Sequence, residues 1–247
     1  MNRNAFRDFF RRSRVARHLA ARGPVFDYHG LAVTMPQSAG LAAMNALLRG
    51  KYESEEAALI AKHLPADLPV IELGGSLGVV SRLIRSRLAP GTRHLVVEAN
   101  PDLIEACSRN ALAGAAPGAT EVLNAALFRD GPEARFRIGE ETHSNALDIG
   151  SGAGRVVAVP AVTLKDLHQR IGSPSAFSLV ADIEGAEFAL FEKDAETLAK
   201  AALAIVELHP KEYAKACRSE GEMDGLIAAA GFRVTERLAD VVLLRST

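Results

Sequence analysis

A glycine-rich segment follows directly after a short apolar run and has residue types suited to binding a ligand. The apolar run covers residues 70–73, and it is followed by Gly74, Gly75, Ser76 and Gly78. Gly74 and Gly75 can adopt backbone angles that a Cβ atom resists, and they let a ligand approach the main chain. Gly78 would allow a helix to pack closely on the strand. Open α/β sheets bind ligands at such turns, at the carboxyl ends of parallel strands.

The spacing of this turn argues against a dinucleotide. A dinucleotide-binding turn reads G-x-G-x-x-G, which from Gly74 requires glycines where the chain has Ser76 and Val79. The observed pattern is E-x-G-x-x-x-G, with Glu72 near the end of the strand. A carboxylate there suits a ligand with a cationic amino group and is unfavourable beside a pyrophosphate. The pattern therefore favours S-adenosylmethionine over NAD, and an NAD-dependent oxidoreductase is the alternative.

Residues at the ends of the next two apolar runs are candidates for binding the nucleoside. Glu98 ends the second run, 20 residues after Gly78. Its carboxylate can accept hydrogen bonds from both ribose hydroxyls. Asn124 or Ala125, in the third run, is expected beside the adenine. The alternative for Glu98 is an exposed acid at a strand end.

Two acidic residues at the end of the fourth run suit methyl transfer to a hydroxyl group. The reaction needs an acceptor aligned with the methyl group and a group that removes the hydroxyl proton. Asp182 and Glu184 would lie on one side, because alternate residues of an extended chain share a side. We expect Asp182 at the methionine end of the cofactor or at the acceptor, and Glu184 at the acceptor or as general base. The alternative for Glu184 is an acid in the first turn of a helix.

Two histidines compete for the role of general base. His209 follows the fifth apolar run, and His143 lies in a Gly-, Ser- and Asn-rich loop, residues 139–154, that could fold over the site. A histidine in a loop is more often a surface residue, so His209 is preferred. No grouping of His, Asp and Glu has a convincing metal-ligand spacing, and we expect no metal, although Asp182 and Glu184 could in principle hold Mg²⁺.

Short apolar runs alternate with longer helical patterns from residue 69 onward. The runs cover residues 70–73, 94–98, 121–127, 177–182, 202–208, 232–236 and 241–244, and the helical patterns cover 78–88, 101–113, 163–171, 186–199, 211–218 and 220–230. This order predicts a doubly wound, mostly parallel α/β sheet with helices on both faces. The last two runs are close enough to form a hairpin, which would add one antiparallel strand near the C-terminus. Residues 132–160 interrupt the alternation with two candidate strands, 134–138 and 155–159.

An arginine-rich segment opens the chain. Residues 1–22 carry a net charge of +6, and the rest of the chain carries −7. Residues 4–21 predict a helix with a broad apolar side, which could contact an anionic membrane or a protein partner, or pack on its own domain. A hairpin around Gly30 and helices at 38–49 and 53–63 follow, and the helix dipole accounts for the acids that begin the last of these. We divide the chain into a basic helical extension, residues 1–50, and a Rossmann-like domain, residues 51–247.

The composition is that of an ordinary globular protein. The 247 residues are 48% hydrophobic and 24% charged, enough to bury a large core. Cys107 and Cys217 show neither a disulfide nor a metal-binding pattern, so a reducing cytoplasm is expected. No apolar run approaches the ~18 residues that a membrane helix needs. The acidic body argues against nucleic acid as a partner.

Several segments together resemble the FkbM-type methyltransferases, a branch of the Rossmann-like class I methyltransferases. The matches are ELGGSLG (72–78) with D-x-G-A-N-x-G, VEANP (97–101) with E-P-x-P, ADIEGAE (181–187) with K-x-D-x-E-G-x-E, VTLKDL (162–167) with T-L-D-D-L and VELHP (206–210) with V-E-x-H. The lysine of the third pattern is absent, and Ala99 stands where the second has proline. The resemblance runs from about Tyr52 to the C-terminus.

The resemblance implies an enzyme that uses S-adenosylmethionine to methylate a hydroxyl group of a sugar, glycan or other small metabolite. It also implies that the segment with Asp182 and Glu184 lines the active site, and it places Ala99 among the cofactor residues. A third hypothesis is non-enzymatic: a membrane-associated or complex-associated protein on a methyltransferase scaffold, docked through its arginine-rich segment. No segment carries a recognisable signature for the acceptor or for an oligomeric state.

Overall fold

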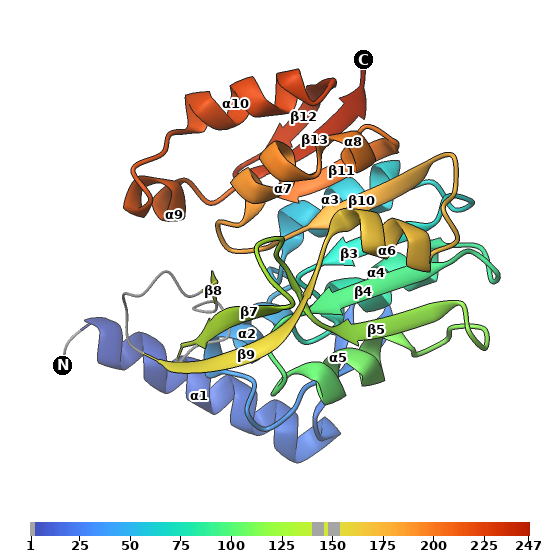
Figure 1. Ribbon diagram of the computed structural model, residues 1–247. Helices are drawn as coiled ribbons and strands as arrows, with labels where there is room; N and C mark the ends of the chain where they lie inside the picture. Colours follow the sequence, from blue (N-terminus) through green and yellow to red (C-terminus); the bar gives the residue numbers. More distant parts are fainter. Residues whose placement is uncertain (1–2, 140–145, 148–153) are drawn as a thin grey trace.

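One sheet forms the centre of the molecule (Figure 1). The computed structural model describes residues 3–139, 146–147 and 154–247. Within these residues the sheet has seven strands in the order β12-β13-β11-β10-β3-β4-β5. They are β3 (Val70–Leu73), β4 (His94–Glu98), β5 (Thr120–Asn124), β10 (Phe177–Ala181), β11 (Ala201–Glu207), β12 (Phe232–Leu238) and β13 (Val241–Ser246).

The direction of each strand follows from the length of its connection. Strands β5, β4, β3, β10 and β11 pair in parallel, and parallel strands need long crossovers, which here contain helices. Only Ala239 and Asp240 separate β12 from β13, too few for a crossover, so β13 runs antiparallel to both β12 and β11. The prediction of a mostly parallel sheet with one antiparallel strand is confirmed.

Helices cover both faces of this sheet, as predicted. One layer contains α3 (Ser54–His63), α4 (Val79–Arg87) and α5 (Ile104–Ala111), and the other contains α6 (Leu164–Arg170), α7 (Glu187–Lys193), α8 (Ala195–Leu198), α9 (Pro210–Lys215) and α10 (Glu220–Ala229). Val70 and Val180 face the first layer, and Ile71 and Leu179 face the second. Because both faces are covered, the strands read as continuous apolar runs.

Two predicted elements are interrupted. The helix expected at 186–199 is divided into α7 and α8 at Asp194, a buried carboxylate that pairs with Arg129 at 2.6 Å. The strand expected at 121–127 leaves the main sheet after Asn124, and its last residues form β6 (Ala126–Leu127) in a second sheet. Both interruptions coincide with contacts between distant parts of the chain, which the local pattern does not show.

The second sheet lies beside the carboxyl ends of the main strands (Figure 1). Its order is β6-β9-β7-β8, with β7 (Glu133–Ile138), β8 (Ala146–Leu147) and β9 (Arg155–Val162). The two candidate strands within residues 132–160 are thereby confirmed. An ion pair between Arg155 and Asp102 ties β9 to the segment before α5. His143 and most of the loop 139–154 lie outside the described residues.

The N-terminal segment packs against the first helical layer. It contains α1 (Arg3–Arg22), β1 (Val25–Tyr28), β2 (Leu31–Thr34) and α2 (Leu41–Leu47). Val15 and Phe26 share one hydrophobic core with Leu83 of α4. The side-chain amide of Asn110 also binds both backbone groups of Thr34, at 2.8 and 3.0 Å. The residues before 50 are therefore continuous with the core of the rest of the chain.

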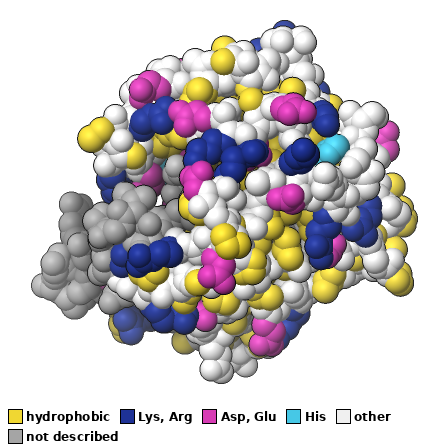
Figure 2. All heavy atoms as spheres, in the orientation of Figure 1, with side chains coloured by type: hydrophobic (Ala, Val, Ile, Leu, Met, Phe, Trp, Pro, Cys, Tyr) yellow, Lys and Arg dark blue, Asp and Glu magenta, His cyan; other side chains and the backbone are white. Residues whose placement is uncertain are grey.

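On the face shown in Figure 2, basic and acidic side chains are interspersed. Within the described ranges, no helix combines the length and the hydrophobicity needed to cross a bilayer.

Candidate active site

The glycines of the turn after β3 are needed for packing between strands. A Cβ atom on Gly74, where φ is +90°, would lie 1.8 Å from the carbonyl oxygen of Asp182, and one on Gly75 would lie 2.4 Å from Cγ1 of Val96. Both residues line a pocket, but the positions that their side chains would fill are taken by neighbouring strands. The glycines therefore bring β3 close to β10 and β4, and the expectation that a ligand approaches the main chain here stays a prediction.

Gly78 has a related role in a different place. It precedes α4 with a φ of +72°, and a Cβ atom there would lie 2.4 Å from the carbonyl oxygen of Cys107 in α5. The prediction that Gly78 lets a helix pack closely on a strand is therefore wrong. The close contact joins two helices, α4 and α5. Gly78 does not line the pocket, whereas Ser76 does.

The carboxylate of Glu98 is held at the pocket by two backbone groups. The backbone N–H groups of Ser76 and Asn100 donate to its two oxygens, each at 2.6 Å. Burial raises the pKa of Glu98, and these hydrogen bonds oppose the rise. Each carboxylate oxygen keeps a further lone pair, so the side chain fits the predicted role of accepting hydrogen bonds from ribose hydroxyls.

Ala125, expected beside the adenine, and Ala99, expected among the cofactor residues, line the pocket. Asn124 does not line it. Its side-chain amide instead donates to the backbone oxygens of Glu98 and Ala99, at 2.9 and 3.1 Å, and so holds the end of β4. Asn124 shapes the site through the backbone of its neighbours.

Glu72 lies at the pocket but is already hydrogen-bonded within the protein. Its carboxylate accepts from the hydroxyl of Ser81 at 2.7 Å and lies 2.8 Å from Nε2 of His94, and the residue is only 2% exposed. Both oxygens therefore have a partner within the protein, and the expected pairing of Glu72 with the amino group of a ligand stays a prediction.

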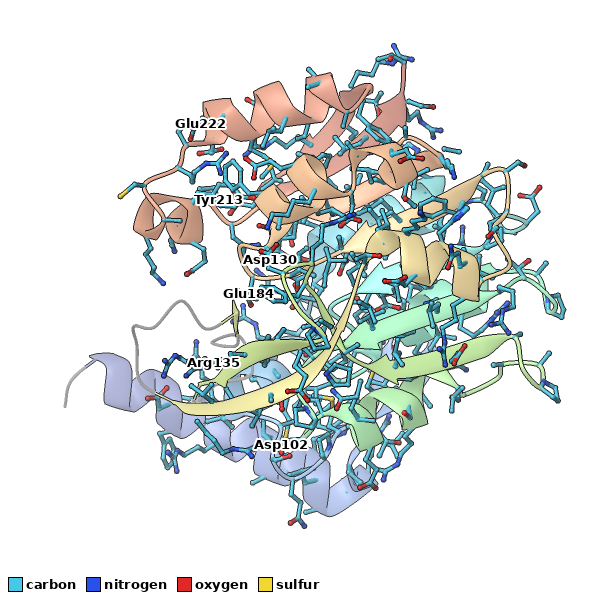
Figure 3. All side chains as sticks on the ribbon, in the orientation of Figure 1. Asp102, Asp130, Arg135, Glu184, Tyr213 and Glu222 are labelled. Carbon is cyan, nitrogen blue, oxygen red and sulfur yellow. The ribbon has the colours of Figure 1, made fainter. Side chains whose placement is uncertain are left out.

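Asp182, Glu184 and His209 converge at the mouth of the parallel strands. Nε2 of His209 lies 3.3 Å from Oδ1 of Asp182 and 3.6 Å from Oε2 of Glu184, while Nδ1 lies 2.8 Å from Oε1 of Glu187. Glu187 is fully buried and also accepts from the backbone N–H of Gly185 at 3.2 Å. In Figure 3, Glu184 lies on the side where β3, β4 and β10 end. The residues selected from the sequence as an acceptor site are thus brought together.

The backbone conformation that brings Asp182 and Glu184 together differs from the predicted one. Strand β10 ends at Ala181, and Glu184 has a left-handed φ of +48°. A turn, and not strand alternation, therefore places Asp182 and Glu184 at the same pocket. Helix α7 begins at Glu187, so Glu184 is not an acid of the first helical turn.

The pKa values of His209 and Glu184 are shifted by their surroundings, and the shifts suit different roles. Burial by itself lowers the pKa of His209, but hydrogen bonds to Asp182 and Glu187 outweigh it and raise that pKa to about 11. Burial and the charge of Asp182 raise the pKa of Glu184 to about 8, although His209 opposes the rise. The raised pKa favours the protonated form of His209 at neutral pH, whereas Glu184 titrates near neutrality. The role of His209 as general base stays a prediction.

One pocket joins the cofactor candidates to the acceptor candidates. Its empty volume is about 1020 Å³, which includes space open to solvent. It is lined by Tyr52, Glu53, Glu56, Glu72, Leu73, Gly74, Gly75, Ser76, Val79, Val80, Val97, Glu98, Ala99, Leu103, Ala125, Ala126, Leu127, Phe136, Asp182, Ile183, Glu184 and Ala186.

The sequence reasoning missed the contribution of α3 to this pocket. Tyr52, Glu53 and Glu56 line it from the N-terminal end of α3. Burial and the charge of Asp182 raise the pKa of Glu53 to about 8 and that of Glu56 well above its ordinary value. The sequence does contain one sign that Glu56 is buried. It lies on the apolar side of the helical pattern, with Leu59 and Ile60, but the helix dipole alone was enough to account for acids at this end of the helix.

A model of the FkbM methyltransferase domain matches residues 73–234, about two thirds of the chain. The chain belongs to the FkbM methyltransferase family. The matched region contains Glu98, Asp182, Glu184 and His209. The acids of α3 lie before it.

Among solved structures, the chain is similar to several methyltransferases. It is 11% identical to the magnesium protoporphyrin IX methyltransferase of Synechocystis PCC 6803 with bound SAM, with 99% of this chain and 96% of that chain covered and a TM-score of 0.47. It is 14% identical to the METTL16 methyltransferase domain (96% and 79% covered, TM-score 0.47). It is 9% identical to a putative tRNA (m1A22) methyltransferase of Streptococcus pneumoniae in complex with S-adenosyl-L-methionine (77% and 71% covered, TM-score 0.45). No curated protein matches the chain.

In this FkbM-family chain, the side chains that converge at the acceptor site also offer atoms that could coordinate a metal ion. One donor atom each from Asp182, Glu184 and His209 lies within 4.8 Å of the others. The donor set fits a divalent ion in principle, but a protonated His209 cannot donate a lone pair to a metal. The expectation of a metal-free site stays a prediction.

Proposed function

We propose that this FkbM-family protein transfers the methyl group of S-adenosylmethionine to a hydroxyl group of a sugar or another small metabolite in the cytoplasm. The observation that carries the proposal is the shared pocket, in which Glu98 and the turn at Gly74 face the same space as Asp182 and Glu184. A nucleoside site and a proton-accepting site in one pocket match the two substrates of a methyl transfer. The acidic lining also suits a cofactor that carries a sulfonium and an amino group.

The residues divide the pocket between the two substrates. Glu98 would accept the ribose hydroxyls, and the small side chains of Ala99 and Ala125 leave room for the adenine. When bound, the cofactor supplies an electrophilic methyl group. The acceptor hydroxyl would lie at Glu184, which lines the pocket together with Asp182.

Glu184 would act as the general base. As the acceptor oxygen forms its bond to the methyl carbon, the bond from that carbon to sulfur breaks and the hydroxyl proton passes to a carboxylate oxygen of Glu184. The pKa of about 8 makes this carboxylate a stronger base than an ordinary glutamate. His209, held as a cation by Asp182 and Glu187, would position both carboxylates, so it is a positioning residue.

Cofactor binding and turnover test the two parts of the proposal separately. Calorimetry should show binding of S-adenosylhomocysteine to the wild-type chain, no comparable binding of NADH, and loss of affinity in Glu98→Ala. Transfer of a labelled methyl group to members of a panel of sugars and hydroxylated metabolites should depend on Glu184. If the wild-type chain bound NADH and did not bind S-adenosylhomocysteine, the result would support an oxidoreductase. Cofactor binding without turnover on any acceptor would favour the non-enzymatic hypothesis.

We also propose that α1 contacts an anionic membrane surface. Phe9 is 64% exposed and Leu19 is 38% exposed, and the exposed Arg12 and Arg17 lie on the same helix. Exposed apolar and basic side chains on one helix suit the boundary between headgroups and acyl chains. Sedimentation with vesicles should show binding to phosphatidylserine-containing vesicles and not to phosphatidylcholine vesicles, and weaker binding for Phe9→Ser and for Arg12→Ser/Arg17→Ser. Equal sedimentation of wild type and variants would contradict it.

A further inference from the structure

Glu56 is a buried acid of the pocket without a partner in the protein. It is 4% exposed and lines the pocket, and no described residue forms a hydrogen bond or an ion pair with it. Burying a carboxylate without a compensating group is costly. An unpartnered, buried carboxylate that faces a pocket therefore suggests that a ligand completes its interactions.

Glu53 is a second acid that lines the pocket. It lies at the N-cap of α3 with a left-handed φ of +40°, and its side chain also forms no hydrogen bond or ion pair with the described residues. After burial, the charge of Asp182 raises the pKa of both Glu53 and Glu56 most. Both acids therefore lie on the Asp182 side of the pocket.

Among the described residues, the lining of the pocket contains six carboxylates and no lysine, arginine or histidine. Four of these carboxylates interact within the protein. Glu72 is bound to Ser81 and His94, Glu98 accepts two backbone N–H groups, and Asp182 and Glu184 face His209. Of the six, Glu53 and Glu56 are the two that have no hydrogen-bond or ion-pair partner among the described residues.

We infer that Glu56, with Glu53 beside it, binds the ammonium group of the cofactor's methionyl part. The inference rests on the proposed use of S-adenosylmethionine. With the ribose at Glu98, the amino acid end of the same molecule would lie farther along the pocket, whose lining also includes Gly74, Asp182 and these two acids. Unlike Glu72, whose carboxylate contacts Ser81 and His94, these two acids have no partner among the described residues.

Two ligands that differ only in the amino acid part separate this role from a general effect on the pocket. S-adenosylhomocysteine carries the ammonium group, and 5′-methylthioadenosine has the same thioether nucleoside without the amino acid. Glu56→Gln should weaken binding of S-adenosylhomocysteine at least about tenfold, the loss expected for one hydrogen bond between charged groups. Its affinity for 5′-methylthioadenosine should stay within about twofold of wild type.

Glu55→Gln is the matched control, because Glu55 is an exposed acid of the same helix whose carboxylate binds only Ser54. It should leave both affinities unchanged. Glu53→Gln is the second variant and should show the same selective loss as Glu56→Gln, to a smaller extent because Glu53 is more exposed. Circular dichroism spectra should establish that each variant is folded.

Two results would overturn the inference. Wild-type affinity of Glu56→Gln for S-adenosylhomocysteine would show that the ammonium binds elsewhere. An equal loss for both ligands would show that Glu56 only supports the shape of the pocket. If the wild-type chain binds neither ligand, the proposed function itself fails, and this outcome is distinct from either of the others.

Discussion

Nδ1 of His209 lies 2.8 Å from Oε1 of Glu187, a carboxylate with no exposed surface. The contact joins the residue after β11 to the first residue of α7. It fixes the imidazole ring so that Nε2 faces Asp182 and Glu184, and it anchors the acceptor side of the pocket to the protein core.

Removing the imidazole should destabilise the protein, because a buried acid loses its cation. We expect His209→Ala to lower the free energy of unfolding by roughly 3–5 kcal/mol, the range for breaking a buried ion pair. Chemical denaturation measures the change. Adding Glu187→Gln to this variant should restore part of the stability, since the glutamine is uncharged. If the double variant were less stable than His209→Ala, the loss of stability in His209→Ala would not come from the unpaired charge of Glu187.

The methylation rate should rise with pH. The pKa of Glu184 is about 8, and only the deprotonated carboxylate accepts a proton, so the rate should increase about tenfold per pH unit below pH 8 and level off above it. A pH profile of kcat checks this expectation. Glu184→Gln should lower kcat by about 10²–10⁴-fold and abolish this pH dependence. A profile that falls as pH rises from 6 to 8 would exclude Glu184 as the base.

The stability of the protein without ligand should fall between about pH 4.5 and 8 through Glu53. Its pKa is raised from 4.5 to about 8 in the folded state, so in this window the folded state holds a proton that the unfolded state has lost. The unfolding free energy then decreases as pH rises. Glu53→Gln should match wild type near pH 4.5 and exceed it in stability above pH 8. Parallel stability curves for the two proteins across this range would contradict the assignment.

Gly74 should tolerate no side chain. A Cβ atom would lie 1.8 Å from the carbonyl oxygen of Asp182 at a φ of +90°, so we expect Gly74→Ala to cost about 4 kcal/mol or more, measured by thermal or chemical unfolding. Gly225 provides the contrast, because it lies in α10 with no atom near its Cβ position. Gly225→Ala should stabilise the protein by up to about 1 kcal/mol. A mild effect at Gly74 would mean that β3 and β10 can separate.

Methyl transfer should survive removal of divalent ions. With a pKa of about 11, His209 is protonated at neutral pH, and its positive charge occupies the position between Asp182 and Glu184 that a metal would take. The rate after dialysis against EDTA should equal the untreated rate. Loss of activity that Mg²⁺ or Mn²⁺ restores would instead show that Asp182, Glu184 and His209 bind a metal.

The order of apolar runs and helical patterns was enough to predict the fold class and to select most of the candidate site residues. Continuous apolar runs separated by helical patterns specify a parallel sheet covered on both faces, because each run must be buried on both sides. The short link between β12 and β13 specifies the one antiparallel strand. Glu98 and Asp182 could be selected because the ends of parallel strands meet at one edge, and position in the chain is enough to identify those ends.

Only the tertiary structure decided which of these groups remain available for a ligand. Glu72, chosen for the amino group, is hydrogen-bonded to Ser81 and His94, and His209, chosen as the base, lies among carboxylates. Glu56 looked like an ordinary acid at the start of a helix, yet it lines the pocket. Hydrogen bonding and burial depend on neighbours that are distant in the chain. Local pattern can therefore place a side chain at an edge of the sheet, but it does not show what that side chain touches.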